Sequence, residues 1–363
     1  MLLVKMMIIS RTPFRISFFG GGTDYPTWYR EHGGAVLATT IDKYCYLTCR
    51  YLPPFFEHRI RLIYSKIENV QQPDELAHPS ARETLRYMKI RRGVEIHHDA
   101  DLPARSGMGS SSAFTVGLLH ALHAMKGKMA GREQLAREAI HIEQNMIRES
   151  VGSQDQILAA YGGFNYITFS TDGRFHVRPI VLAQQRMREL AAHLMLFYTG
   201  IKRTASDVAA TFVSTINDKR RHLLSMRGLV EEAVKLLNSN RPIAEFGKLM
   251  DETWQLKREL SAKISNAQVE GLYSKAISAG ALGGKLTGAG GGGFLLLVVP
   301  RDKQAAVRAK LHRLIHVPFR FEFFGSQIIF YDVEQDYAAV EKERARRPVE
   351  SFQELAEIEA ASG

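Results

Sequence analysis

The sequence predicts an α+β protein of two domains, and three observations lead to that prediction. First, 363 residues are more than one hydrophobic core usually organises. Second, 45% hydrophobic and 24% charged residues form an ordinary globular composition. Third, both halves mix strand-like and helical segments, as expected for helices packed on mainly antiparallel sheets. We place the boundary near residue 182, which gives domains 1–182 and 183–363 with a cleft between them.

Strands dominate the start of the chain. The apolar opening "MLLVKMMIIS" is followed by "RTPFR" with no small-residue cleavage site, so we expect a first β-strand there. Residues 35–52, "AVLATTIDKYCYLTCRYL", are rich in β-branched and aromatic side chains and predict a second strand. In an extended strand Cys45 and Cys49 would lie roughly 13 Å apart, too far to bridge each other. Two unbridged cysteines favour a reducing, cytoplasmic setting.

Helical spacing appears in the middle of the chain. Residues 131–150, "GREQLAREAIHIEQNMIRES", repeat apolar positions at helical intervals, and a mostly helical stretch runs from about Ala205 to Ala279. The second half closes with the strand-like "GGGFLLLVVP" and "FRFEFFGSQIIFYD" around the helical "DKQAAVRAKLHRLI". No apolar run approaches the length of a membrane-spanning helix.

The net charge of +10 is spread along the chain. Lys and Arg alternate with Asp and Glu instead of forming blocks, which favours anionic small molecules as partners. No zinc-ligand spacing, aromatic RNA-binding strand or basic arm accompanies the charge, so we expect neither a nucleic-acid partner nor a membrane partner.

A Gly-Ser stretch precedes a buried helix at residues 102–113, "LPARSGMGSSSA". Its glycines let backbone N–H groups approach an anion, and a helix beginning near Ser111 adds its positive end. The serine hydroxyls could cap the helix, bind phosphate oxygens or hold Mg²⁺. A plain helix cap after a turn is the alternative. Neither the P-loop nor the G-x-G-x-x-G pattern is present, so a different phosphate-binding loop is required.

A second glycine stretch interrupts the first strand at residues 11–28, "RTPFRISFFGGGTDYPTW". An Asp after a glycine turn, here Asp24, can accept hydrogen bonds from sugar hydroxyls, and Arg15 could reach a phosphate or a carboxylate. A hairpin turn stabilised by the Asp is the alternative.

A third glycine stretch, "KLTGAGGGGF", occupies residues 285–294. So many glycines cost chain entropy, so we expect a close approach by either a ligand phosphate or the Gly-Ser loop. The alternative is a tight turn into the following strand.

Two carboxylates lie between these stretches, Glu143 on a helix and Asp155 in the next turn region. Near a phosphate site they would serve as one metal ligand and one general base. Charges on a solvated helix face are the alternative.

Taken together and in this order, the stretches resemble those of the GHMP kinases, the family of galacto-, homoserine, mevalonate and phosphomevalonate kinases. "PFRISFFGGGTDYP" is similar to the first motif of that family, "LPARSGMGSSSA" to the second and "KLTGAGGGGF" to the third, while "GSQDQ" matches the segment with the catalytic Asp. The resemblance implies an N-terminal domain like the second domain of ribosomal protein S5 and a ferredoxin-like C-terminal domain. ATP would bind between glycine loops at their junction.

The resemblance also implies roles for single residues. Asp155 would be the base, and Arg15 would keep it ionised and offset charge on the transferred phosphoryl group. Glu143 and Ser111 would hold Mg²⁺. The ATP-binding residues would be Pro103, Arg105, Ser106, Gly107, Met108, Gly109, Ser110, Ser111 and Ser112. The substrate-binding residues would be Gly20, Gly21, Gly22, Thr23, Asp24, Tyr25, Gly288, Gly290 and Gly291.

The first motif narrows the choice of substrate. It contains Gly-Gly-Gly-Thr-Asp where galactokinase-type enzymes carry Gly-Glu-His-Thr-Asp. The triple-glycine form and "YTGIKRTASDV" are similar to those of D-glycero-D-manno-heptose 7-phosphate kinases, which phosphorylate the anomeric oxygen. The expected product, heptose 1,7-bisphosphate, would serve nucleotide-activated heptose and bacterial surface polysaccharide synthesis.

An acceptor that already carries a phosphate requires extra cations, and Lys202 and Arg203 are the candidates. A solvated surface pair is the alternative for these two side chains. A kinase for fucose or another free sugar, or a sensor of the same fold that binds ATP and sugar without turnover, remains as an alternative function. A homodimer is also compatible with the family.

Overall fold

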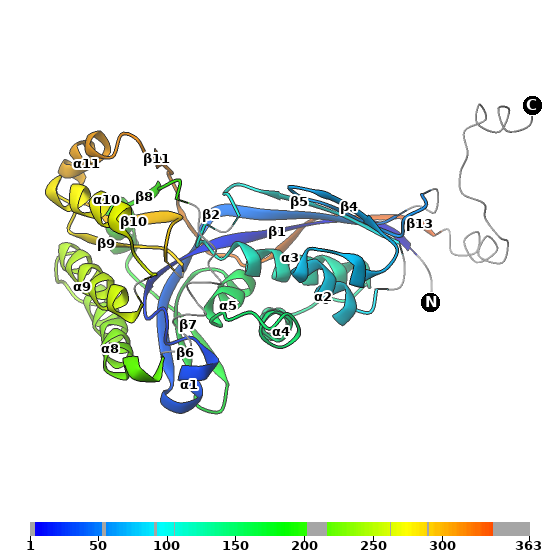
Figure 1. Cartoon of the computed structure of the whole chain (residues 1–363), viewed down its shortest axis with the longest axis horizontal. Helices are drawn as coiled ribbons and strands as arrows, with labels where there is room; N and C mark the ends of the chain where they lie inside the picture. The colour runs from blue at the N-terminus through cyan, green and yellow to red at the C-terminus, as the bar shows by residue number, and fades with distance from the viewer. Residues whose placement is uncertain are drawn as a thin grey trace, which may run out of the picture.

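The computed structural model describes residues 4–52, 56–90, 93–104, 106–201, 216–261, 263–288 and 290–336. These residues form two β-sheets that lie in different parts of the molecule, each with helices packed against it (Figure 1). The mixed architecture of helices and mainly antiparallel strands confirms the predicted α+β class.

The first sheet is built around two long strands. β1 and β2 pair along most of their lengths, and the second half of β2 pairs with β5 while its first half pairs with β6. All pairings in this sheet are antiparallel except that of β3 with β5. The strands are β1 Val4–Phe19, β2 Gly34–Tyr51, β3 Ile60–Ile63, β4 Ile67–Val70, β5 Val94–Ala100, β6 Phe164–Phe169, β7 Phe175–Pro179, β12 Phe321–Glu322 and β13 Gln327–Asp336.

Helices cover one face of this sheet (Figure 1). The central one, α3, is apolar almost all around and packs on β1 and β2, as expected for a helix inside a core. α4 continues into a π-helical turn, η2, so the predicted helix over residues 131–150 changes its winding partway. The helices are α1 Pro26–His32, α2 Pro79–Tyr87, α3 Ser110–Met125, α4 Arg132–His141, η2 Ile142–Met146 and α5 Gln154–Tyr161.

The second sheet has the strand order β11-β8-β10-β9 and is antiparallel throughout. α9 packs on β9 and β10, and α8 packs on α9 and also contacts β1 and β2, which joins the two halves. The elements are α6 Gln184–His193, β8 Leu194–Tyr198, α8 Arg220–Leu237, α9 Ala244–Leu260, α10 Ala267–Ser278, β9 Gly283–Leu286, β10 Phe294–Val298, α11 Gln304–Lys310 and β11 Ile315–His316.

The last strands return to the first sheet. "FRFEFFGSQIIFYD" forms β12 and β13, but these pair with β2 and β1 and not with the strands of the second half. The boundary that we place near residue 182 therefore separates β12 and β13 from the sheet that they complete. The division into domains 1–182 and 183–363 stays a prediction.

The two cysteines match the expectation from their spacing. Cys45 and Cys49 are free, buried thiols on β2. Burial raises the pKa of the Cys49 thiol to about 12, which keeps it protonated and unreactive at neutral pH. Among the described residues, no helix combines the length and apolar character needed to cross a membrane.

Candidate active site

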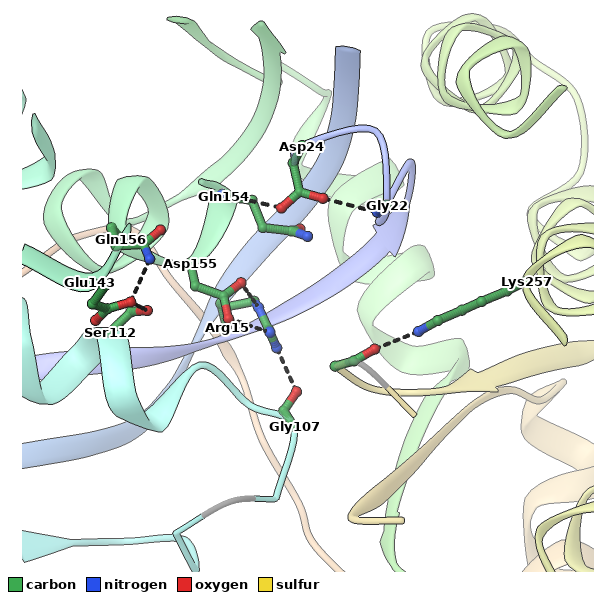
Figure 2. A network of polar contacts seen from close by, with 11 residues as sticks. Arg15, Gly22, Asp24, Gly107, Ser112, Glu143, Gln154, Asp155, Gln156 and Lys257 are labelled. Carbon is green, nitrogen blue, oxygen red and sulfur yellow. Dashed lines mark hydrogen bonds and ion pairs between the residues drawn. The ribbon is translucent and has the colours of Figure 1, made fainter. Parts of the chain in front are cut away.

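Arg15 and Asp155 form the centre of the site (Figure 2). Arg15 Nε donates to Asp155 Oδ1 at 2.7 Å and Arg15 Nη2 donates to Asp155 Oδ2 at 2.6 Å, so the ion pair is bidentate. The third donor, Nη1, binds the backbone carbonyl of Gly107 at 2.6 Å. The Arg15 side chain is 6% exposed and that of Asp155 is 24% exposed. The guanidinium is therefore fixed, while the carboxylate remains open to a ligand.

The local sequence explains this placement. Arg15 lies on β1, and Asp155 lies in the first turn of α5. A residue larger than glycine at position 109 would place its Cβ 3.1 Å from Arg15 Cγ and 3.5 Å from Asp155 Oδ2. Gly109 has φ 76°, in the left-handed region that favours glycine. This glycine thus lets the Gly-Ser loop reach the ion pair.

Asp24 lies next to this pair on the glycine turn after β1. Its Oδ1 accepts a hydrogen bond from the Gly22 N–H at 2.9 Å, and its Oδ2 accepts a longer one from the Gln154 N–H at 3.4 Å. Burial raises the pKa of the Asp24 carboxyl, and the Gly22 N–H partly opposes this. Asp24 therefore stabilises its own turn, which was the alternative to a role in sugar binding. It also lies next to the Arg15–Asp155 pair.

Gly152 is a functional position that the sequence analysis missed. A Cβ at this residue would lie 1.9 Å from Asp24 Oδ2, which no real structure allows. The absence of a side chain at position 152 therefore lets Asp24 pack against the segment that leads to Asp155. A single glycine in "SVGSQD" gave no signal for this role.

The third glycine stretch contacts the Gly-Ser loop. This contact is one of the two close approaches that we predict for it, the other being a ligand phosphate. A Cβ at Gly107 would lie 2.6 Å from the Thr287 carbonyl oxygen, and one at Gly288 would lie 2.5 Å from the Gly107 Cα. The side-chain oxygens of Ser106 and Thr287 are buried without a hydrogen-bond partner in the described structure. Two backbones in contact, with unpaired polar atoms beside them, leave a surface suited to a polar ligand.

The first turn of α3 differs from the expectation in one respect. The helix begins at Ser110 with Gly109 as the N-cap, and no side chain caps it. Hydroxyl capping by the serines, one of the predicted possibilities, is therefore wrong in this structure. The uncapped N–H groups of a long helix favour an anion at this end.

Glu143 forms the fourth part of the site. It is fully buried on the π-helical turn η2, a type of turn often found at functional sites. Its Oε2 accepts hydrogen bonds from Ser112 Oγ at 2.9 Å and Gln156 Nε2 at 2.5 Å, whereas its Oε1 has no partner in the described structure. Burial raises the pKa of Glu143 to about 7.

Ser112 contacts Glu143, and Ser111, which we predict as the metal ligand, is exposed. Ser112 is therefore the serine that lies against Glu143, and the assignment of Ser111 to Mg²⁺ stays a prediction. Successive helical residues point about 100° apart, because a helix has 3.6 residues per turn. Within the described residues, no cluster of three or more His, Cys, Asp or Glu side chains forms a metal site.

Two buried lysines join the site from the second half of the chain, and the sequence analysis gave neither of them a role. Lys257 on α9 donates to the Gly288 carbonyl at 2.5 Å, and Lys285 on β9 donates to the Phe18 carbonyl at 3.1 Å. Burial is the main cause that lowers the pKa of both ammonium groups, to about 8 for Lys257. Repulsion from Arg15 contributes in both cases.

The structure brings most of the predicted site residues together. Gly20, Gly21, Gly22, Thr23 and Tyr25 surround Asp24 on the first glycine turn, and Gly290 and Gly291 follow Gly288 on the third stretch. Met108 is buried behind the Gly-Ser loop, its carbonyl accepting from the Arg15 N–H, whereas Pro103 is exposed. Arg105, Lys202 and Arg203 lie outside the described residues.

Comparison with known proteins agrees with this geometry. The GHMP kinases N terminal domain matches residues 75–163, and the GHMP kinases C terminal domain matches residues 231–316. The first match contains the Gly-Ser loop, Glu143 and Asp155, and the second contains Lys257 and the third glycine stretch. The chain therefore carries both domains of the GHMP kinases, and it is an ATP-dependent phosphotransferase with an alcohol group as acceptor.

Some relatives are sugar kinases, and others are mevalonate kinases. D-glycero-alpha-D-manno-heptose 7-phosphate kinase of Campylobacter jejuni is 29% identical over 315 residues, which cover 83% of this chain and 92% of that protein. L-fucokinase/L-fucose-1-P guanylyltransferase of Bacteroides fragilis is 26% identical, but this chain spans only 36% of its length.

Solved structures support the fold. The D-glycero-D-manno-heptose 1-phosphate kinase of Bacteroides thetaiotaomicron superposes with a TM-score of 0.71 at 24% identity, covering 88% of this chain and 98% of that one. Lactococcus lactis galactokinase also gives a TM-score of 0.71, at 17% identity, covering 89% of this chain and 95% of that one. Similarity at such low identity confirms the architecture but does not identify the substrate, which must be inferred from the residues of the site.

Proposed function

We propose that this protein transfers the γ-phosphoryl group of ATP to the anomeric hydroxyl of D-glycero-D-manno-heptose 7-phosphate, giving the 1,7-bisphosphate. The observation that carries this proposal is the match with the heptose 7-phosphate kinase of Campylobacter jejuni, which extends over 92% of that protein. The Gly20–Gly21–Gly22 turn that presents Asp24 also supports it, because the Glu and His of the galactokinase-type motif are absent.

Asp155 acts as the general base. Its carboxylate is the more exposed member of the ion pair, so an acceptor hydroxyl can approach it. Asp155 takes the proton of this hydroxyl as the new oxygen–phosphorus bond forms, and the bond between the γ-phosphorus and the bridging oxygen breaks to release ADP. A base of this kind contributes about 10² to 10⁴ in rate.

Arg15 orients the base and supplies positive charge. Its two parallel hydrogen bonds hold both oxygens of Asp155, and its third bond ties the pair to the Gly-Ser loop at Gly107. A fixed guanidinium at this point also stabilises the negative charge that develops on the transferred group.

Asp24 holds the acceptor. Burial is the main cause that raises the pKa of Asp24, and repulsion from the nearby Asp155 carboxylate adds to it. Carboxylate oxygens accept hydrogen bonds from sugar hydroxyls, so we assign Asp24 to the sugar hydroxyls near the reacting carbon.

Glu143 and Ser112 fit a magnesium ion. Oxygen donors are the ligands that Mg²⁺ prefers, and the unpaired, buried Oε1 of Glu143 is a carboxylate oxygen of this kind. When bound, Mg²⁺ neutralises charge on the phosphate oxygens of the nucleotide. Gln156 keeps the Glu143 carboxylate oriented through its hydrogen bond to Oε2.

A kinase for a free 6-deoxy sugar is the second candidate. The observation in its favour is the match with the L-fucokinase of Bacteroides fragilis over 84% of this chain. Its acceptor would need no cation beyond those that serve ATP.

Release of ADP from Mg·ATP tests the proposal. D-glycero-D-manno-heptose 7-phosphate is compared with free heptose, fucose, galactose and mannose, and ³¹P NMR locates the new phosphate. A strong preference for the phosphorylated heptose, with the new phosphorus coupled to the anomeric proton, supports it. Turnover with fucose alone would replace it by the second candidate, and ATP binding without turnover of any sugar would favour a sensor.

A further inference from the structure

Lys257 is a buried ammonium group without a counter-ion. The residue is 6% exposed, and within the described part of the chain no carboxylate lies within 4.0 Å of its Nζ. Its only hydrogen-bond acceptor among these residues is the Gly288 carbonyl. Burying an unpaired charge is costly, so such groups usually neutralise or meet an anion. An ammonium group has three N–H donors, and the described structure gives a partner to one of those of Lys257.

The position of Lys257 indicates which ligand it meets. Figure 2 shows Lys257 and Glu143 on opposite sides of the Arg15–Asp155 pair. The charges that act on Lys257 are that of Arg15, which repels it, and those of Asp24 and Asp155, the two residues assigned to the acceptor, which attract it. Lys257 therefore lies on the acceptor side of the ion pair, away from the candidate metal ligand.

Among the described residues near the ion pair, Lys257 is the cation best suited to an acceptor phosphate, and the predicted Lys202 and Arg203 lie outside these residues. The charge of Arg15 is paired with Asp155, and three of its five N–H donors bind Asp155 and Gly107. Lys285 is more deeply buried and donates to Phe18 O, and burial lowers its pKa well below the ordinary value, which favours its neutral form. A phosphate carries up to two negative charges and three acceptor oxygens, which suits an ammonium with free donors.

We propose that the Lys257 ammonium binds the phosphate group of a phosphorylated acceptor and thereby selects a sugar phosphate over the free sugar. This assignment rests on the proposed function and adds a specificity-determining residue to it. Helix α9 brings this cation from the second half of the chain to the base on the first half, so the complete acceptor site needs both halves.

Steady-state kinetics of three variants test this assignment. Lys257→Met removes the charge at similar size, Lys257→Arg keeps it, and Lys248→Met is the matched control on an exposed position of the same helix. We expect Lys257→Met to raise the KM for heptose 7-phosphate by about 30-fold or more, as loss of a charge-assisted contact does. The KM for ATP and the kcat/KM for free heptose should stay within about threefold, and Lys257→Arg should recover most of the loss.

Two results would overturn the assignment. An equal loss of kcat/KM with the phosphorylated and the free heptose would mean that Lys257 acts on the transferred phosphoryl group or only supports the third glycine stretch. A wild-type KM for heptose 7-phosphate in Lys257→Met would remove Lys257 from the acceptor site.

The assignment can fail separately from the proposed function. If the wild-type enzyme turns over only free sugars, the proposed function is wrong, and protection by inorganic phosphate then tests Lys257 with the nucleotide site saturated by Mg·AMP-PNP. Phosphate should raise the Tm of the wild type and of Lys248→Met but not that of Lys257→Met, and this result supports an anion site at Lys257. Equal rises in the wild type and Lys257→Met, or no rise in either, contradict it.

Discussion

Replacing Glu143 with Gln should stabilise the metal-free protein, even though it removes a predicted metal ligand. Gln keeps the size of the side chain and can accept from Ser112 and Gln156 through its carbonyl oxygen. It also replaces the unpaired Oε1 with a neutral amide. The buried charge of Glu143 is then absent at every pH.

The magnitude follows from the pKa of this carboxyl. Burial raises the folded-state pKa from 4.5 to about 7. At about 1.4 kcal/mol per pH unit, this difference costs the folded protein about 3 kcal/mol above pH 7. Below pH 4.5 the carboxyl is protonated in both states and the cost vanishes, so wild-type stability falls as the pH rises from 4.5 to 7.

Urea unfolding in EDTA at pH 5 and pH 8 measures this effect. The stability of Glu143→Gln relative to the wild type should increase by about 2 kcal/mol between these two pH values. Added Mg²⁺ should raise the Tm of the wild type and not that of the variant. Glu133→Gln, on the exposed part of α4, is the control and should show little change with pH.

The reasoning fails if the difference between Glu143→Gln and the wild type is the same at both pH values. It also fails if the variant is the less stable protein at pH 8 in EDTA. Either result would mean that the folded protein already compensates the charge of Glu143 without a metal.

Three further substitutions test the geometry around the base. Arg15→Lys keeps the charge but loses the bidentate contact with Asp155. We expect kcat to fall about 10²-fold and the KM for ATP to stay within about threefold of the wild-type value. Gly152→Ala should displace Asp24 and raise the KM for the acceptor at least about 10-fold, because its Cβ would overlap the carboxylate. Gly107→Ala should lower the Tm and raise the KM for ATP, since its φ of 79° and the facing loop both exclude a methyl group. Gly131→Ala, with open space around its Cβ, is the control and should behave as the wild type in every assay.

The sequence was sufficient for the features that depend on local chain segments. The strands β1 and β2 and the three glycine stretches follow from composition and short motifs. The pairing of Arg15 with Asp155, which the structure contains, was implied by the resemblance to the GHMP kinases. The close approach of the glycine stretches was also predictable, because such a density of glycine has an entropy cost that contact with another backbone explains.

Features that depend on distant contacts were not predictable from one sequence. The sequence of β13 is typical of a strand, and no nearby residue indicates that this strand pairs with β1 at the other end of the chain. Lys257 is one of several charged residues on an amphipathic helix, and only the packing of α9 on β9 brings it close enough to Asp24 and Asp155 for their charges to act on it.

The choice between Ser111 and Ser112 shows a different limit. It depends on where α3 begins, and a shift of one residue turns the side chain by about 100°. Sequence signals locate helix ends only to within a few residues, so the serine that faces Glu143 required the structure.

The turnover of Asp155→Asn tests the central claim most directly, namely that the Arg15–Asp155 pair is the catalytic base and its orienting group. Single-turnover phosphoryl transfer is measured alongside binding of Mg·ATP, because Asn keeps the size of the side chain. A rate lowered by at least about 10², with ATP affinity nearly unchanged, is the predicted result. Phosphoryl transfer at close to the wild-type rate would contradict the assignment of Asp155 as the base.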